Sequence, residues 1–272
     1  MMLLLLFGSF FLLLALGVPI LFSMGMSAGI YYVVSGYPLM QFVQKTIGGV
    51  DSFTLLAIPF FLLAGDIMGK GGISKRMLRF ANALVGPLTG GLAVTGVVSS
   101  AMFGTICGSA PATAASIGSI VAPDMEARGY SKRFTGSIIA ASGLLGIIIP
   151  PSIVMVNYGA TAGVSIGSLF IGGIIPGIMA MLGLAIFSVW QSKKYGYGLV
   201  DGHKQHYDLR EILVSFKGAI LPLTTPLFIL GSIMLGIATA TEAAVISVVW
   251  SAFLTVVVYR EITVKELCTI IT

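Results

Sequence analysis

Charged residues are scarce in this chain of 272 residues: they make up 9%, against 57% hydrophobic residues. A soluble domain carries roughly 25% charged residues and needs a polar exterior that this composition does not supply. The composition therefore excludes an ordinary soluble fold and indicates that lipid is the solvent. In lipid, only helices and closed barrels can pair all of their backbone polar groups. Because the apolar runs are long and continuous rather than short and alternating, we predict an all-α polytopic membrane protein.

Cysteine and histidine are also rare, with two residues of each. Cys107 and Cys268 are far apart in apolar surroundings, so we expect neither a disulfide framework nor a metal site. We interpret His203 and His206 as a solvated cluster in a polar loop, because no wider set of metal ligands accompanies them. The sequence has no nucleophile–base pair, phosphate loop or haem motif, so we expect no enzyme activity and no cofactor.

Acidic residues are fewer than basic ones, which leaves a formal net charge of +5. Lysine and arginine concentrate at 70–79, 128–133 and 193–217, and Arg260 follows. Cytoplasmic loops of membrane proteins carry such an excess, so we place these loops in the cytoplasm and expect no nucleic-acid partner. We expect no cleavable signal peptide, because residues 2–34 are apolar for too long and lack a basic start.

The apolar runs predict the membrane segments, since about 20 residues cross the hydrocarbon core. The first run, 2–34, is interrupted at Gly17-Val18-Pro19 and forms either one kinked helix or two short ones. The later runs are 54–69, 86–123, 134–163, 166–192, 218–237 and 241–259. The chain from Arg260 onward is partly amphipathic, and we expect it to lie in the membrane interface.

The interval 86–127 begins and ends at basic loops, and its centre from Thr105 to Thr113 consists of small, apolar and hydroxylated residues. Two interpretations are open: two spanning helices with an external turn, or a re-entrant hairpin whose tip stops at mid-membrane. An exposed turn normally carries charged or large polar residues, which this centre lacks, and small residues permit close backbone packing. Irregular backbone at membrane depth needs protein or a cavity around it. We favour the hairpin.

A second interruption lies between Gly143 and Ser152 and contains Pro150-Pro151. Neither proline has an N–H donor, and Pro151 disfavours helical geometry at Pro150, so we expect the helix to unwind within the run 134–163. Ser152 can cap a new half-helix. A simple proline kink is the alternative, but two interrupted segments in one membrane domain are typical of ion-coupled transporters.

These two interruptions offer ligands for a cation and for an anion. Unwound carbonyls and hydroxyls supply the oxygen ligands that sodium prefers, without a buried net charge. Ser109, Thr113 and Ser152 offer hydroxyls. Gly108 and Gly146 permit backbone geometries that direct carbonyls toward a cation. The half-helix N-termini that follow each interruption would present unpaired N–H groups to a carboxylate.

Other polar residues in the apolar runs also have structural interpretations. Asn157 follows the second interruption and is a candidate ligand for a substrate, with a helix–helix hydrogen bond as the stronger alternative. Asp66 lies four residues before Lys70, the spacing of an interfacial ion pair. Thr241 can cap a helix with Glu242 in its first turn, and a proton relay through Glu242 is the alternative.

Four short motifs follow one another along the chain: AIPFFLLAG at 57–65, GSAPAT at 108–113, IIPPS at 148–152 and TEAA at 241–244. Together they closely resemble the large membrane subunit of TRAP transporters, the tripartite ATP-independent periplasmic family, over essentially the whole chain. The resemblance implies a fold similar to that of divalent-anion:sodium symporters, with two inverted repeats. In that family each repeat carries one re-entrant hairpin and one broken helix.

The resemblance implies an elevator-type, sodium-coupled, multi-pass importer of the bacterial inner membrane. In that family a periplasmic binding protein delivers an organic acid, often a C4-dicarboxylate or a sialic acid, and a small membrane subunit braces the large one. The candidate sodium-binding residues are Cys107, Gly108, Ser109, Gly146 and Pro150. The candidate substrate-binding residues are Ala110, Thr113, Ser152 and Asn157. The family usually has serine at the position of Cys107, and since a thiol is a poor sodium ligand, we assign only its backbone carbonyl.

The resemblance also divides the chain into three parts. Residues 1–85 would be N-terminal membrane helices of the scaffold and arm. Residues 86–163 would be half of a transport domain, with the hairpin at 86–127 and the broken helix at 134–163. Residues 164–272 would add scaffold helices, the cytoplasmic loop 193–217 and a terminal interfacial arm.

Family members are considerably longer, so we expect the second hairpin and the second broken helix to be missing and this chain alone not to transport. The alternative is a truncated, non-transporting scaffold or assembly partner. An intramembrane enzyme would need a polar catalytic constellation at membrane depth, which the sequence does not offer. A passive channel is a further alternative, but the pattern of two interruptions suits the gated site of a carrier better.

Overall fold

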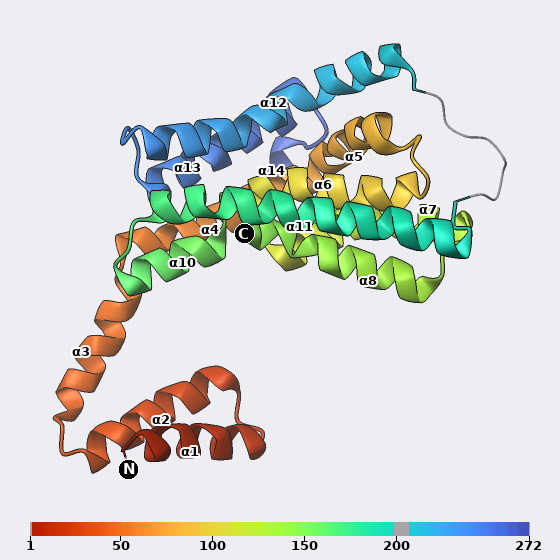
Figure 1. The fold of residues 1–272 in the computed structure, drawn as a ribbon. Coiled ribbons are helices and arrows are strands. Elements are labelled where there is room, and N and C mark those ends of the chain that lie inside the picture. Colours follow the sequence, from red (N-terminus) through yellow and green to blue (C-terminus); the bar gives the residue numbers. More distant parts are fainter. Residues whose placement is uncertain (1, 199–206, 272) are drawn as a thin grey trace. The chain divides into compact units, whose positions relative to one another are not determined.

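The computed structural model describes residues 2–198 and 207–271, and the regular structure of these residues is entirely helical (Figure 1). The prediction of an all-α polytopic membrane protein is confirmed. The chain forms two compact units, one up to Ser52 and one from Phe53 onward, which are described separately. The predicted cluster of His203 and His206 lies outside the described residues.

The first unit contains three helices: α1 (Met2–Ala15), α2 (Ile20–Val34) and α3 (Leu39–Val50). The first apolar run is therefore two short helices rather than one kinked helix. Gly17 takes a left-handed φ of 82° in the turn, and Pro19 precedes the first residue of α2. Proline is favoured beside a helix start because its ring fixes φ and its missing N–H is not needed there. Helices α1 and α2 pack against each other.

The second unit contains the remaining elements. They are η1 (Phe53–Leu56), α4 (Ala57–Lys70), α5 (Ile73–Val85), α6 (Gly91–Cys107), α7 (Ala110–Ala127), α8 (Lys132–Gly143), α9 (Leu145–Ile148), α10 (Ile153–Ala162), α11 (Ile166–Tyr195), α12 (Leu209–Met234), α13 (Ala240–Ala252), the π-helix η2 (Phe253–Val258) and α14 (Val264–Ile271).

Four helical segments among the described residues are long and apolar enough to cross a membrane. They are Phe53–Lys70, Ile166–Tyr195, Leu209–Met234 and Ala240–Val258, at the positions of four predicted runs. The segment Lys132–Ile148 and helix α10 form a further pair, bent by 44° at a short break. Counted as one span, this pair occupies the predicted run 134–163.

Helix α6 lies at the centre of the second unit and packs against α5, α7, α8, α9 and α11. Its small residues recur every four positions, at Gly96, Ser100 and Gly104, and therefore lie on one face. Gly96 packs against α7, Ser100 approaches the Ser142 hydroxyl of α8 at 3.4 Å, and Gly104 lies against Gly146 of α9. Small side chains bring these helices close together, as is common between helices in membranes.

Helix α13 packs along α4, and its start differs from the prediction. Thr239, not Thr241, is the N-cap: its hydroxyl accepts from the Glu242 N–H, and the Glu242 carboxylate accepts from the Thr239 N–H at 2.7 Å. The Thr241 hydroxyl instead donates to the Phe53 carbonyl at 2.9 Å and joins α13 to η1. The expected cap at Thr241 is therefore wrong, because Glu at the third helical position selects the threonine three residues before it.

The expected ion pair of Asp66 with Lys70 is also wrong. The ion pairs within the described part of the chain are Arg76–Glu261, Arg79–Glu211 and Lys132–Glu126. Asp66 and Lys70 are both exposed on α4. At an exposed position the attraction of such a pair is small and does not fix two long side chains in contact.

Candidate ion and substrate site

The turn between α6 and α7 is short and buried. Helix α6 ends at Cys107, and Gly108 takes a left-handed φ of 61° that lets its N–H donate to the Gly104 carbonyl at 2.9 Å. Ser109 is extended, and its hydroxyl accepts from the Ala112 N–H at the start of α7. Cys107 and Gly108 are buried. An external turn would be exposed, so the burial of this turn supports the hairpin interpretation.

The second interruption separates α9 from α10. Ile149 is extended, the peptide bond between Pro150 and Pro151 is cis, and α10 begins after Ser152. The Ser152 hydroxyl accepts from the Met155 N–H at 3.4 Å, so the predicted cap is confirmed. The same hydroxyl donates to the Ile147 carbonyl at 2.8 Å. That carbonyl has no helical donor, because the residue four positions further on is Pro151.

The two interruptions contact each other directly. The Ile153 N–H, at the start of α10, donates to the Gly108 carbonyl at 3.2 Å. A Cβ on Gly146 would lie 2.6 Å from the Thr113 Oγ1 and 3.0 Å from the Ser109 carbonyl oxygen. Residues 107–113 and 146–152 therefore form one contiguous site, called here the tip–break junction. Eight of the nine predicted site residues belong to it.

Gly65 of α4 also contacts the junction, although it was not among the predicted site residues. A Cβ on Gly65 would lie 2.5 Å from the Cys107 Cβ, so only glycine allows α4 to approach the hairpin tip this closely. The signal in the sequence was the glycine that ends the AIPFFLLAG motif at 57–65. This motif served only to establish the resemblance, and its packing role depends on the tertiary contact.

Two carbonyls of the junction lack the usual helical donor. Four residues after Cys107 comes Pro111, and four residues after Gly146 comes Pro150. Proline has no N–H, so neither carbonyl can accept the i+4 hydrogen bond that a continuing helix would provide. Carbonyls at the C-terminal end of a helix also carry partial negative charge. Cys107 and Gly146 thus place carbonyl oxygens without an i+4 donor at the end of α6 and in the single turn of α9.

The other predicted oxygen ligands are already hydrogen-bonded. The Gly108 carbonyl accepts from the Ile153 N–H. The Ser109 carbonyl accepts from the Thr113 N–H at 3.0 Å and from the Thr113 hydroxyl at 2.8 Å. Each carbonyl oxygen has two lone pairs, so Gly108 keeps capacity for a further partner, whereas Ser109 has both engaged.

The predicted substrate ligands differ in their surroundings. Thr113 is buried, and its Oγ1 lies 3.1 Å from the Cys107 sulfur. Ser152 is also buried, and Ala110 is partly exposed in the first turn of α7. Asn157 is exposed on α10, and no hydrogen bond of the described residues joins its side chain to the junction. The structure therefore brings three of these four residues together and leaves Asn157 apart.

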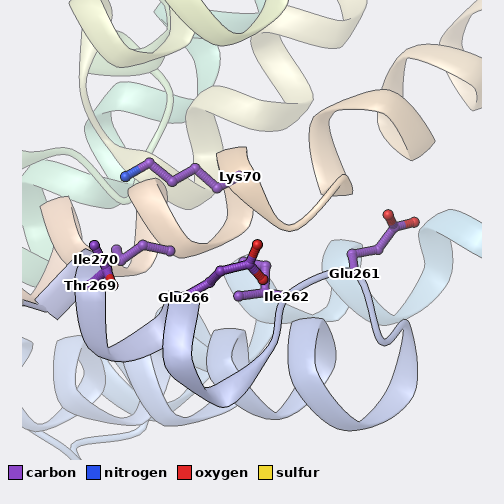
Figure 2. Close-up of a pocket in the computed structure, with 6 residues that line it drawn as sticks. All are labelled: Lys70, Glu261, Ile262, Glu266, Thr269 and Ile270. Carbon is purple, nitrogen blue, oxygen red and sulfur yellow. The ribbon is translucent and has the colours of Figure 1, made fainter.

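A separate cavity of about 280 Å³ lies between the charged end of α4 and α14 (Figure 2). Lys70, Glu261 and Glu266 line it, together with apolar side chains and Thr269. Glu261 pairs with Arg76 at 2.8 Å, and hydrogen bonds from Thr263 hold the pKa of Glu266 below its ordinary value. Both carboxylates stabilise the local fold, so we assign no ligand to this cavity.

A helical membrane protein in which two interrupted segments meet has the architecture of a transporter. The family model described as "Tripartite ATP-independent periplasmic transporter, DctM component" matches residues 7–272. The chain therefore belongs to this family of transporter permeases, as the resemblance implied, and the family is not one of enzymes.

Curated relatives cover most of this chain. It is 41% identical over 258 residues to the isethionate TRAP transporter permease protein DctMQ of Oleidesulfovibrio alaskensis, which is 94% of this chain and 40% of that protein. It is 37% identical to the C4-dicarboxylate TRAP transporter large permease protein DctM of Rhodobacter capsulatus, over 97% of this chain and 62% of the relative. It is 38% identical to the sialic acid TRAP transporter large permease protein SiaM of Vibrio cholerae, over 93% of this chain and 58% of the relative. The chain thus spans 40 to 62% of the length of these relatives.

Proposed function

We propose that this chain provides the tip–break junction of a sodium-coupled TRAP large permease that imports an organic acid across the bacterial inner membrane. The hydrogen bond from the Ile153 N–H to the Gly108 carbonyl carries the proposal, because it joins the hairpin tip to the broken helix. The substrate class is a C4-dicarboxylate, a sialic acid or a similar carboxylate, as in the names of the relatives. The partners are a periplasmic binding protein and a small membrane subunit.

In this proposal sodium binds to the carbonyls that prolines leave without donors. The Cys107 carbonyl lies at the end of α6 and the Gly146 carbonyl in the single turn of α9, and the Gly108 carbonyl adds a third oxygen. Backbone oxygens at unwound helix ends coordinate a cation without a buried carboxylate. An ion held between α6 and α9 would stabilise the contact of the tip with the break, so sodium would order the surface that receives the substrate.

The substrate carboxylate would lie at the starts of α7 and α10. The first N–H groups of each helix have no carbonyl partner within the helix and carry partial positive charge. Ser109 and Ser152 each occupy one such N–H as a cap. The remaining N–H groups, including that of Ala110, are the donors that we assign to an anionic oxygen.

The experiment measures thermal unfolding of the purified chain in detergent, with sodium chloride against potassium chloride at equal ionic strength. We expect sodium to raise the melting temperature and the increment to shrink in Gly146→Ala. The increment should also shrink in Ser109→Ala, because this variant removes the cap of α7 directly beside the Cys107 and Gly108 carbonyls. Ser165→Ala is the matched control for the serine, since Ser165 caps α11 in the same way. Gly136→Ala is the control for the glycine, because a Cβ there meets no atom within 4 Å.

Equal melting temperatures in the two salts, or a sodium increment that both junction variants retain in full, would contradict the proposal. Sodium-independent co-purification with a small membrane subunit, together with no sodium effect on unfolding, would instead favour the scaffold role.

A further inference from the structure

The end of α11 and the turn between α7 and α8 meet at one end of the second unit (Figure 1). The Gly198 N–H donates to the Arg128 carbonyl at 3.4 Å, and the Tyr197 hydroxyl donates to the Ser131 hydroxyl at 3.0 Å. These contacts join two segments that are distant in the sequence. The place of the basic residues on these segments is therefore fixed by tertiary structure.

Stacked aromatic rings hold the two segments together. The Tyr197 ring stacks on Tyr130 at 5.2 Å and on Phe134 at 5.5 Å between centroids. The Tyr195 ring also stacks on Tyr197, with 5.7 Å between their centroids. Tyr130 and Phe134 are buried. Such ring pairs add about 0.5–1.5 kcal/mol each beyond their buried area, so the stack is a rigid base for the charges around it.

Five exposed cations lie on the two segments that this stack joins and form what we call the basic patch: Arg128, Lys132, Arg133, Lys193 and Lys194. Of these five, only Lys132 pairs with a carboxylate of the described residues, at 3.9 Å from Glu126. Asp124 and Glu126 lie nearby in the last turns of α7, which leaves an excess of positive charge. The general excess of lysine and arginine in cytoplasmic loops does not depend on where in a loop these residues lie. Here, in contrast, two segments that are distant in the sequence bring their basic residues to one patch.

The length of α11 and the aromatic residues near its end indicate that the patch lies at the level of the lipid headgroups. Helix α11 has 30 residues and, at 1.5 Å per residue, is about 45 Å long, against about 30 Å for the hydrocarbon core. Its last turns therefore extend into the headgroup layer. The Lys194 Nζ lies 5.2 Å from the Trp190 ring centroid and 5.4 Å from that of Tyr195. Tryptophan and tyrosine are typical of the membrane interface, immediately below such charges.

We propose that the basic patch binds the phosphate-bearing headgroup of an anionic phospholipid. Guanidinium groups bind phosphate oxygens through two parallel hydrogen bonds, and the lysine amines of the patch add further positive charge. A zwitterionic lipid brings its own cation, which the excess positive charge repels. An anionic headgroup neutralises the patch without such a cost. The proposal is independent of sodium and of the transported substrate.

Trp190 provides a local reporter for the test. The chain has two tryptophans, so Trp250→Phe leaves Trp190 beside the patch as the only indole. The protein is placed in bilayers of phosphatidylcholine and phosphatidylglycerol, with bromine on the chains of one lipid at a time. We expect stronger quenching of Trp190 by brominated phosphatidylglycerol than by an equal mole fraction of brominated phosphatidylcholine.

Charge variants then separate a site from a general charge effect. Each cation near an anionic surface contributes about a fivefold preference for phosphatidylglycerol over phosphatidylcholine. The double variant Arg133→Gln with Lys193→Gln should therefore reduce this preference by up to about thirtyfold, or abolish it if the initial preference is smaller than that. The matched control is Lys75→Gln with Arg210→Gln, two exposed cations outside the patch, which should leave the preference unchanged.

Three results would overturn the proposal. They are equal quenching by both lipids in the protein with an intact patch, the same loss of preference in the control pair, and a change of Trp190 emission when inorganic phosphate alone is added in detergent. Native mass spectrometry of the unsubstituted protein provides a second measurement. We expect phosphatidylglycerol to remain bound at collision energies that remove phosphatidylcholine, and equal retention would count against the site.

Discussion

Gly146→Ala tests whether the tip–break junction depends on close packing. The new Cβ would lie 2.6 Å from the Thr113 Oγ1 and 3.0 Å from the Ser109 carbonyl oxygen, both inside van der Waals contact. Thr113 is buried and cannot rotate away without losing its 2.8 Å hydrogen bond to that carbonyl. The Ser109 oxygen belongs to the backbone, so relief of the clash requires the hairpin tip to shift.

The expected loss follows from three terms. Overpacking a well-packed site costs about 1–3 kcal/mol, and the lost hydrogen bond of Thr113 adds about 1 kcal/mol. Replacing glycine by alanine in a helix returns at most about 1 kcal/mol. The net loss of stability is therefore about 1–3 kcal/mol. Gly136→Ala on α8 has no atom within 4 Å of its Cβ and should be neutral or gain up to about 1 kcal/mol.

Thermal unfolding of both variants in one detergent measures the difference. A change of 1 kcal/mol shifts the melting temperature of a chain of this size by about 2–4 °C, and the stabilities of the two variants differ by about 1–4 kcal/mol, so their melting temperatures should differ by about 2–16 °C. If Gly146→Ala melts within about 1 °C of Gly136→Ala, the junction has room for a methyl group. The reasoning about its packing would then be refuted.

Three further substitutions probe the same structure. Gly108→Ala adds left-handed strain and a Cβ 3.1 Å from a backbone oxygen of the broken helix, whereas Gly163→Ala adds only the strain. We therefore expect Gly108→Ala to be less stable than Gly163→Ala by about 1–3 kcal/mol and to melt at a lower temperature. Equal melting temperatures would show that the contact is not tight. Ser152→Ala removes the cap of α10 and the hydroxyl that donates to the Ile147 carbonyl, so chemical unfolding should show a loss of stability of about 2–4 kcal/mol. Ser165→Ala removes only a cap and should cost about 1 kcal/mol. Similar losses in the two variants would exclude a contribution from the hydrogen bond to Ile147. The pKa of Glu266 is lowered in the folded chain, so its cap on α14 is fully present above the ordinary carboxyl pKa and is lost as pH falls from that value through the lowered pKa of the folded chain. Hydrogen-exchange protection in the first turn of α14 should fall in that range, and a Glu266→Gln variant with the same pH profile would disprove this cause.

The interruptions were predictable because they follow from local chemistry. Pro150 and Pro151 have no N–H, so a helix cannot continue through them on backbone hydrogen bonds alone. Ser152 follows directly and has the side chain of a helix cap. Gly108 can take the left-handed conformation that ends α6. None of these statements needs a contact with another part of the chain.

The cap of α13 shows where a local signal was available but misread. Thr239 precedes α13 and Thr241 is its second residue, and the pairing with Glu242 three residues later identifies Thr239 as the cap. The second threonine is used elsewhere, as a donor to η1. The Asp66–Lys70 pair failed for a different reason, since i,i+4 spacing permits an ion pair but supplies little energy at an exposed position.

The sequence by itself determined the solvent, the helical class and the positions of the two interruptions. Its composition requires lipid, and proline and glycine act on the backbone within a few residues of where they stand. Only the tertiary structure decided that the Gly108 carbonyl meets the Ile153 N–H, and that Gly65 and Gly146 lie against the hairpin tip. These contacts join segments far apart in the chain, and they form because packing at glycine positions brings backbones together. The same holds for the basic patch, whose charges were visible in two separate loops and whose concentration depends on one aromatic stack.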